Sequence, residues 1–173
     1  SMDTEGRVIY AGSFSKVLSA GMRIGWAIAR HDIMEKMIIC KQVSDVHTTM
    51  LTQMMAYEFF TRYSLDGHIE KSRRLYGERC RAMLGFMDKY FPRFCAYTRP
   101  EGGIFLWCSL PEKYDTSELF KKAVEKKVAF VAGNGCQVDT KKKSNDFRLN
   151  YSLSDIPRIE EGIIRLSDVI KNY

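Results

Sequence analysis

A lysine in a short polar loop is the first residue whose type and setting could do chemistry. Lys16 ends the stretch Gly12-Ser-Phe-Ser-Lys16, in a Gly- and Ser-rich connection that runs on to Gly21. Continuous apolar runs at residues 7–11 and 24–29 flank this connection, which predicts strands buried on both faces of an α/β sheet. Loops between such strands commonly carry the chemistry of α/β proteins. A lone lysine after a Ser-rich loop is more often a solvated surface residue, so both interpretations stay open.

Two arginines are candidates for binding anionic groups. Arg23 opens the second apolar run, and Arg148 lies in the stretch Phe-Arg-Leu-Asn-Tyr-Ser at residues 147–152. The planar fork of a guanidinium group matches carboxylate and phosphate oxygens in pairs. Either arginine alone is equally typical of an exposed charge on a strand.

Long helical segments follow the loop. Residues 32–42, 49–63 and 67–91 are predicted as helices, and Pro92 ends the last of them. Apolar residues at helical spacing among many charges make that last helix amphipathic: Ile69, Leu75, Met83, Leu84, Phe86 and Met87.

The second half of the chain alternates strands and helices. Residues 94–98 and 104–110 are predicted as a hairpin joined through the Pro- and Gly-containing turn at 99–103. Asp115-Thr-Ser-Glu118 caps a helix that runs to Lys127, and residues 128–131 and 147–152 are further strands.

The final helix begins after Ser154 or Asp155, either of which can cap it, and runs through Ile170. Its apolar face is predicted to hold Ile159, Ile163, Leu166 and Ile170. The second half is therefore an α+β domain of about three strands and two or three helices. The first two strands lack partners of their own, so we expect the sheet to which they belong to be completed by sequence outside this chain.

Composition indicates a soluble protein with one good core. The 173 residues are 45% hydrophobic, with no apolar run near the roughly 20 residues of a membrane span and no signal peptide. Five cysteines without metal-ligand spacing are expected to be reduced, mostly structural thiols of a cytoplasmic protein. The net charge of +6 is dispersed, and the run Lys141–Lys143 has the composition of a solvated loop, which disfavours nucleic-acid binding by this segment.

Several motifs together resemble one family. Gly12–Lys16 followed by Gly21-Met-Arg-Ile-Gly25, then the stretches at residues 99–107, 128–133 and 147–152, follow the order and spacing of the C-terminal portion of fold-type I, pyridoxal-phosphate-dependent class I/II aminotransferases. The resemblance covers nearly the whole chain. It is strongest to the group of 2-aminoadipate and kynurenine aminotransferases and to the aminotransferase-like domains of MocR-type regulators.

The resemblance implies a role for each candidate residue. Lys16 would hold pyridoxal 5'-phosphate as a Schiff base and then move protons at the substrate α-carbon. Ser13, Ser15 and Arg23 would bind the cofactor's phosphate, and Arg148 the α-carboxylate of the substrate. Ala20 replaces a proline common in the family, which removes no ligand.

The resemblance also implies a fold, a domain organisation and partners. We expect the α/β (α+β) fold of the small domain together with the last strands of a truncated large domain. Residues 1–30 would be the remnant of the large domain, 31–66 connecting helices and 67–173 the small domain. The parent enzyme would be a homodimer that passes an amino group from an amino acid to a 2-oxo acid. Asp45–Thr49 resembles a segment near the dimer interface, where His47 has no expected chemical step.

Some parts of the family's site precede the lysine segment: an aspartate for the pyridine nitrogen, a stacking aromatic ring and further phosphate donors. We therefore expect this chain alone to lack significant transaminase activity. Two hypotheses remain for the parent protein. It is either a catalytic aminotransferase or a MocR-type regulator whose aminotransferase-like domain senses an effector. A helix-turn-helix region upstream would distinguish the regulator.

Overall fold

The computed structural model describes residues 3–173 and divides the chain into two compact units, Ser1–Lys71 and Ser72–Tyr173. The elements are β1 (Tyr10–Ser13), β2 (Gly25–Ile28), α1 (His31–Ser44), α2 (Met50–Arg62), α3 (Leu65–Tyr90), β3 (Ala96–Tyr97), β4 (Phe105–Ser109), α4 (Thr116–Glu125), β5 (Val131–Ala132), β6 (Asp146–Asn150) and α5 (Ile156–Lys171), with 3-10 turns η1 (Ala20–Met22) and η2 (Gly133–Cys136). Within residues 3–173, no helix is both long and apolar enough to cross a bilayer.

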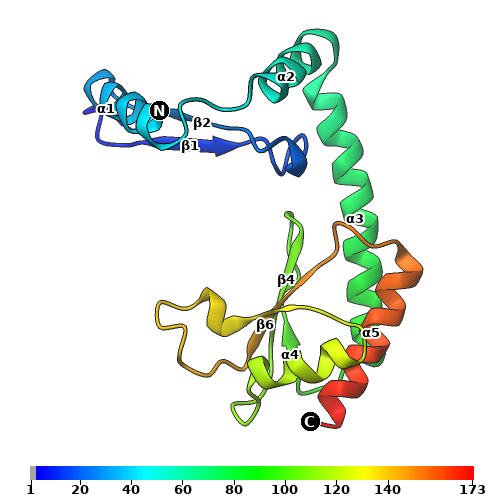
Figure 1. Cartoon of the computed structure of the whole chain (residues 1–173). Helices are drawn as coiled ribbons and strands as arrows, with labels where there is room; N and C mark the ends of the chain where they lie inside the picture. The colour runs from blue at the N-terminus through cyan, green and yellow to red at the C-terminus, as the bar shows by residue number, and fades with distance from the viewer. Residues whose placement is uncertain (1–2) are drawn as a thin grey trace. The chain divides into compact units, whose positions relative to one another are not determined.

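The first unit carries an antiparallel pair of strands and two helices. β1 pairs with β2 from Tyr10 opposite Ile28 to Ser13 opposite Gly25 (Figure 1). The expected burial of these strands on both faces is wrong for this chain, because Val8, Ile9, Tyr10 and Ile28 are each at least half exposed. The two-stranded sheet has no third strand among the described residues, so nothing within it covers these side chains.

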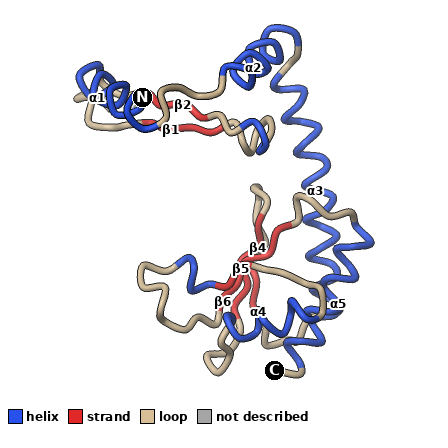
Figure 2. The backbone as a smooth tube through the Cα atoms, in the orientation of Figure 1, coloured by secondary structure: helices blue, strands red, loops and turns tan. Residues whose placement is uncertain are grey.

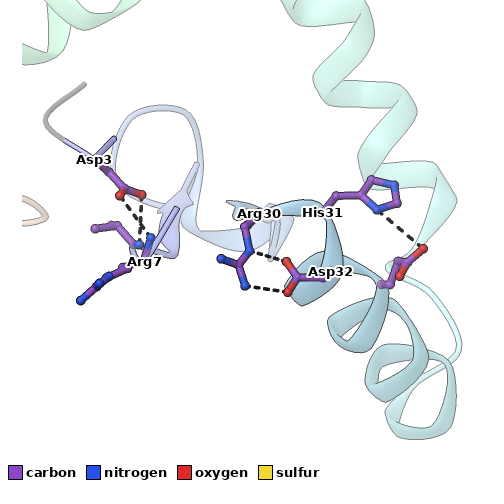
Figure 3. A network of polar contacts seen from close by, with 7 residues as sticks. Asp3, Arg7, Arg30, His31 and Asp32 are labelled. Carbon is purple, nitrogen blue, oxygen red and sulfur yellow. Dashed lines mark hydrogen bonds and ion pairs between the residues drawn. The ribbon is translucent and has the colours of Figure 1, made fainter. Parts of the chain in front are cut away.

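A bidentate ion pair lies at the connection between β2 and α1. Arg30, the residue before α1, donates from Nε and Nη2 to the carboxylate of Asp32 at 2.6 and 2.7 Å (Figure 3). The hydrogen bonds from Arg30 lower the pKa of Asp32 to about 2. The carboxylate stays ionised in the first turn of the helix, where negative charge is favourable.

The second unit has a four-stranded antiparallel sheet in the order β3-β4-β6-β5 (Figure 2). The predicted hairpin is confirmed, since Ala96 pairs with Ser109 and Tyr97 with Cys108. Its turn contains Gly103 at φ 85°, a conformation that glycine adopts without a Cβ penalty. The predicted strand at 128–131 is shorter and later, because β5 pairs with β6 only at Val131 and Ala132.

The core lies between this sheet and the helices. Leu106 and Cys108 of β4 and Phe147 of β6 are fully buried, and Leu149 is nearly so. The predicted face of α5 is confirmed: Ile159, Ile163, Leu166 and Ile170 are all buried.

Hydrogen bonds join α5 to α3 beside this core. Ser167 Oγ donates to the carbonyl of Tyr90 at 2.6 Å, and the Tyr90 hydroxyl donates to Glu160 at 2.8 Å. In α3, Met83 and Met87 are buried as predicted, whereas the expected core residue Leu75 is 44% exposed. Leu75 is not among the residues that pack on this core, although its neighbour Tyr76 is.

Candidate functional site

The loop between β1 and β2 is held in a fixed shape by its own backbone. Phe14 donates its N–H to the carbonyl of Ile24 at 3.1 Å, which closes the loop across the ends of the two strands. The carbonyl of Phe14 accepts the N–H groups of Leu18 and Ser19 at 2.8 and 3.1 Å. Lys16 therefore lies in a hydrogen-bonded turn and not in an extended connection.

Two glycines permit close packing at the base of this loop. A Cβ on Gly12 would lie 2.3 Å from the indole ring of Trp26, and one on Gly25 would lie 2.8 Å from the carbonyl oxygen of Gly12. Real Cβ atoms essentially never approach other atoms so closely, so a side chain at either position would force its neighbour to shift. Both glycines belong to the sequence motif, but the motif does not reveal that Trp26 is the reason for one of them.

The loop brings together the three residues predicted to bind phosphate. Arg23 Nη1 donates to Ser15 Oγ at 3.3 Å and to the carbonyl of Ala20 at 3.2 Å. Ser13 Oγ accepts the N–H of Ser15 at 3.1 Å. Both serine hydroxyls therefore serve as acceptors within the loop and keep their own protons for donation to a ligand.

Arg23 adopts an unusual backbone conformation at this place. Its φ of 55° and ψ of 41° lie in the left-handed region, which costs a residue with a side chain about 1–2 kcal/mol. Such strain persists where surrounding contacts impose it and is frequent at functional sites. Here the strained backbone accompanies the contact between the guanidinium and Ser15.

The charge of the segment suits an anion. Lys16 and Arg23 are the cations between Gly12 and Ile28, and no aspartate or glutamate occurs between Gly6 and His31. Arg7 and Arg30, at the ends of the segment, pair with Glu5 and Asp32. Lys16 is exposed, as are Ser13 and Arg23, whereas Ser15 is half-buried. The donors are thus presented at the surface of the first unit, where a ligand can reach them.

Arg148 occupies a well-defined position in the second unit. It lies in β6 opposite Trp107 of β4 and Val131 of β5. Its guanidinium carbon is 4.0 Å from the centroid of the Phe105 ring, a cation–π contact that orients the charged group. The half-buried side chain lines a cavity of about 600 Å³ within this unit.

The structure therefore brings together the loop residues Ser13, Ser15, Lys16 and Arg23, while Arg148 belongs to the other unit. A common site that includes Arg148 stays a prediction. No group of three or more histidine, cysteine, aspartate or glutamate residues within 3–173 could hold a metal ion.

The segment between α1 and α2 has a second strained backbone. Val46 has a φ of 63°, which is a genuine outlier for a β-branched residue. The next residue, His47, donates its N–H to the carbonyl of Asp45 at 2.7 Å, and its Nδ1 lies 2.9 Å from the carbonyl oxygen of Thr48. These contacts keep the histidine in the turn before α2, and the expected proximity of this segment to a dimer interface stays a prediction.

Comparisons with known proteins agree on one family. The family model described as aminotransferase class I and II matches residues 1–166. A solved kynurenine aminotransferase of Pyrococcus horikoshii, in complex with PMP, superposes with a TM-score of 0.90 at 39% identity, covering 98% of this chain and 42% of that one. The α-aminoadipate aminotransferase of Thermus thermophilus, complexed with N-(5'-phosphopyridoxyl)-L-leucine, gives 0.90 at 40% identity, over 95% and 42% of the two chains.

A regulator is also similar. An HTH-type transcriptional regulator of Bacillus subtilis is 29% identical over 99% of this chain, which is 35% of the regulator's length.

The chain spans 43% and 41% of the length of two curated aminotransferases that it matches at 40% and 41% identity. The match to the family model across nearly all of the sequence, on the same fold, shows that this chain belongs to the aminotransferase class I and II family.

Proposed function

We propose that this chain is the C-terminal part of a pyridoxal-phosphate-dependent aminotransferase, which transfers an amino group between an amino acid and a 2-oxo acid. The observation that carries the proposal is the contact of Arg23 with Ser15, in a loop that also holds Ser13 and Lys16. Family membership supports the same function.

The loop residues fit a phosphate-bearing cofactor. Two hydroxyl donors and a guanidinium lie in one hydrogen-bonded turn that contains no carboxylate, which is the donor set that a phosphate dianion requires. Ser13, Ser15 and Arg23 would hold the phosphate of pyridoxal 5'-phosphate. When bound, this cofactor supplies an electron sink for the bond electrons released at the substrate α-carbon.

Lys16 and Arg148 would act on the substrate. The Lys16 amine would hold the cofactor and would take and return the proton at the substrate α-carbon. Arg148 binds the α-carboxylate of amino acid or 2-oxo acid with its guanidinium fork, which the Phe105 ring already orients. Fixing that carboxylate sets the orientation of the α-carbon.

The same proposal includes the setting of the parent protein. It would be a cytoplasmic homodimer, with residues 1–30 in the large domain, 31–66 connecting it to the small domain, and 67–173 forming the small domain. Extensive exposed apolar surface on α2 supports an interface there: Met50, Leu51, Met54, Met55 and Tyr57 are each more than half exposed.

A second candidate function is the effector-sensing domain of a MocR-type transcriptional regulator. The similarity to a Bacillus subtilis HTH-type regulator over 99% of this chain supports it. The two candidates differ in turnover: an aminotransferase consumes amino acid and 2-oxo acid catalytically, whereas a sensor binds them with little turnover.

The test is steady-state kinetics of the full-length protein that contains this chain. We expect Lys16→Ala to abolish transamination, because it removes the amine proposed to move the proton at the α-carbon. We expect Arg148→Lys to raise KM for both substrates about 10- to 100-fold, since a bidentate charge-assisted contact is replaced by a point charge. Full-length protein with no turnover of any amino acid but with specific DNA binding would favour the regulator.

We further propose that the 173-residue chain alone does not catalyse turnover, because it corresponds to about two fifths of the length of its curated relatives. Turnover of an amino acid and 2-oxoglutarate by the purified chain would refute this part of the proposal.

A further inference from the structure

An asparagine followed by a glycine lies in the loop after β5, in a part of the chain that the proposed function does not use. The sequence has four asparagines, at positions 134, 145, 150 and 172, and only Asn134 precedes a glycine. An asparagine side chain loses its amide group when the backbone nitrogen of the next residue attacks it. A glycine hinders this attack least, because it has no Cβ and a freely adjustable backbone. Asn134 is therefore the asparagine most susceptible to this chemistry.

The structure places the two reacting groups beside each other. Gly135 donates its N–H to Oδ1 of Asn134 at 3.0 Å, so the attacking nitrogen lies next to the side-chain amide. Gly135 is exposed, and a Cβ built on it would meet no described atom within 4 Å apart from its chain neighbours. Solvent therefore reaches this peptide bond, and the backbone has room to change shape as a ring closes.

The Asp66-Gly67 pair shows the contrasting case. An aspartate before a glycine can close the same ring with loss of water. Here, however, Gly67 lies in the first turn of α3 and donates its N–H to Ser64 Oγ at 3.1 Å. The nitrogen that would attack is engaged by another residue, and the helix holds it there. The sequence offers two such dipeptides, and the structure favours ring closure at Asn134.

We propose that Asn134 is a site of spontaneous deamidation, with water as the co-reactant. The backbone nitrogen of Gly135 forms a bond to Cγ of Asn134, and the bond from Cγ to Nδ2 breaks. Ammonia leaves with the proton of the Gly135 nitrogen, and a succinimide ring remains. Water then adds to one of the ring carbonyls and opens it to an aspartate or an isoaspartate, so no electron is transferred at any step.

Deamidation removes a hydrogen bond that closes the loop. Asn134 Nδ2 donates to the carbonyl of Thr140 at 3.2 Å, and an ionised carboxylate has no proton to donate. The base of the loop is held separately, since Gly133 is buried and a Cβ on it would lie 2.5 Å from Ser144 Oγ. The modification therefore loosens the middle of the loop, which contains Lys141–Lys143, and leaves the sheet in place.

The first test is incubation of the 173-residue chain at mildly alkaline pH in water labelled with heavy oxygen, followed by peptide mass spectrometry. We expect Asn134 to take up the label at least about tenfold faster than Asn145, with aspartate and isoaspartate both present. Gly135→Ala is the matched variant. Its methyl group enters open space, so the fold is retained, and we expect it to slow the conversion about tenfold.

Conversion of Asn134 no faster than that of Asn145, or a rate that Gly135→Ala leaves unchanged, would overturn the site. Lys16→Ala should not alter the rate, because Lys16 belongs to the other unit. The proposal is thus decided separately from the cofactor chemistry.

The second test concerns the loop, and Asn134→Asp reproduces the aspartate product for it. We expect trypsin to cleave the folded variant at Lys141–Lys143 about fivefold faster than the unaltered chain, as the loss of one hydrogen bond implies. Asn172→Asp is the control, because the Asn172 side chain donates to Asp168 at the end of α5. Equal cleavage in the two variants would contradict the role of Asn134 in closing the loop.

Discussion

At the scale of single residues, the loop around Lys16 depends on contacts that admit no larger side chain. The indole of Trp26 covers Gly12, and Tyr10 packs edge-on against that indole with ring centroids 4.8 Å apart. The position of Ser13, the next residue, follows from this packing. The geometry of the loop proposed to bind phosphate is therefore set by apolar contacts beneath it as well as by hydrogen bonds.

Replacement of Gly12 tests this dependence. We expect Gly12→Ala to destabilise the first unit by about 1–3 kcal/mol, because its methyl group must displace the Trp26 ring. Urea unfolding followed by tryptophan fluorescence would measure the loss. Gly21→Ala is the matched control, since its Cβ would meet only the Ser19 hydroxyl at 3.9 Å. Equal effects of the two substitutions would contradict the packing argument.

The cysteines differ in reactivity by their burial. Cys80, Cys95 and Cys108 are buried, whereas Cys40 and Cys136 are exposed. We expect a thiol reagent at neutral pH to label the two exposed cysteines rapidly and the other three only upon unfolding. Mass spectrometry of the labelled peptides would show the order, and rapid labelling of Cys95 or Cys108 would contradict it.

Burial of two of these thiols also makes stability depend on pH. Desolvation raises the pKa of Cys95 to about 12 and raises that of Cys108 as well. The unfolded chain then loses these protons at a lower pH than the folded one. We expect the free energy of unfolding to be unaffected by these thiols below about pH 8.5, the ordinary thiol pKa, and to fall as pH rises from there towards 12.

Urea midpoints measured from pH 7 upwards would test this linkage, with Cys95→Ala reducing the slope and Cys40→Ala leaving it unchanged. A slope that Cys95→Ala does not alter would contradict the assigned cause.

At the scale of elements, the residues at helix ends lead to the most specific predictions about stability. The sequence leaves Ser154 and Asp155 as alternative caps of α5, and the structure selects Asp155, whose Oδ1 accepts the N–H of Arg158 at 3.1 Å. We expect Asp155→Ala to cost about 1 kcal/mol of stability and Ser154→Ala much less. Denaturant unfolding followed by circular dichroism would measure both, and equal costs would contradict the assigned cap.

At the end of α4, we expect a substitution to increase stability instead of lowering it. We expect Lys127→Gly to stabilise the second unit by about 1 kcal/mol, because glycine occupies the left-handed position without the cost of a Cβ. Lys126→Gly, at the neighbouring position with φ −90°, should destabilise it instead. The same unfolding experiment compares the two, and a loss of stability in Lys127→Gly would contradict the strain.

Elements were predictable where a periodic apolar pattern met a clear boundary signal. The helix expected at residues 49–63 is α2, Met50–Arg62, and the hairpin around Gly103 was correctly foreseen. The pattern failed at Leu75, since periodicity does not show how much of an apolar helix face the core covers. It also misplaced β5, because an apolar stretch at 128–131 does not reveal which of its residues pair with a neighbour.

At the scale of the whole molecule, the two units differ in how completely they bury their apolar residues. The second unit has one continuous core, to which both its sheet and its helices contribute buried residues. Among the described residues of the first unit, Ile24 and Ala56 are the buried apolar ones, and many others on β1, α1 and α2 are exposed. The first unit therefore offers most of the surface on which further protein could pack.

The sequence predicted one part of the candidate site, the loop around Lys16, and did not predict the cavity beside Arg148. Motif order identified Ser13, Ser15, Lys16 and Arg23, and the structure shows the contacts between Arg23, Ser15 and their loop. No motif indicated that residues of α5, such as Arg158, line the cavity beside Arg148, because these residues are distant in sequence and come together through the packing of α5 beside β6.

The most direct test of the account is borohydride trapping of pyridoxal 5'-phosphate on this chain, with peptide mass spectrometry to locate the reduced adduct and Lys16→Ala as control. The account predicts that Lys16 is labelled selectively at low cofactor concentration, and that Arg23→Gln weakens this selectivity by removing a phosphate ligand. Labelling spread over many lysines and unchanged in Lys16→Ala would contradict the role of this loop as a cofactor site.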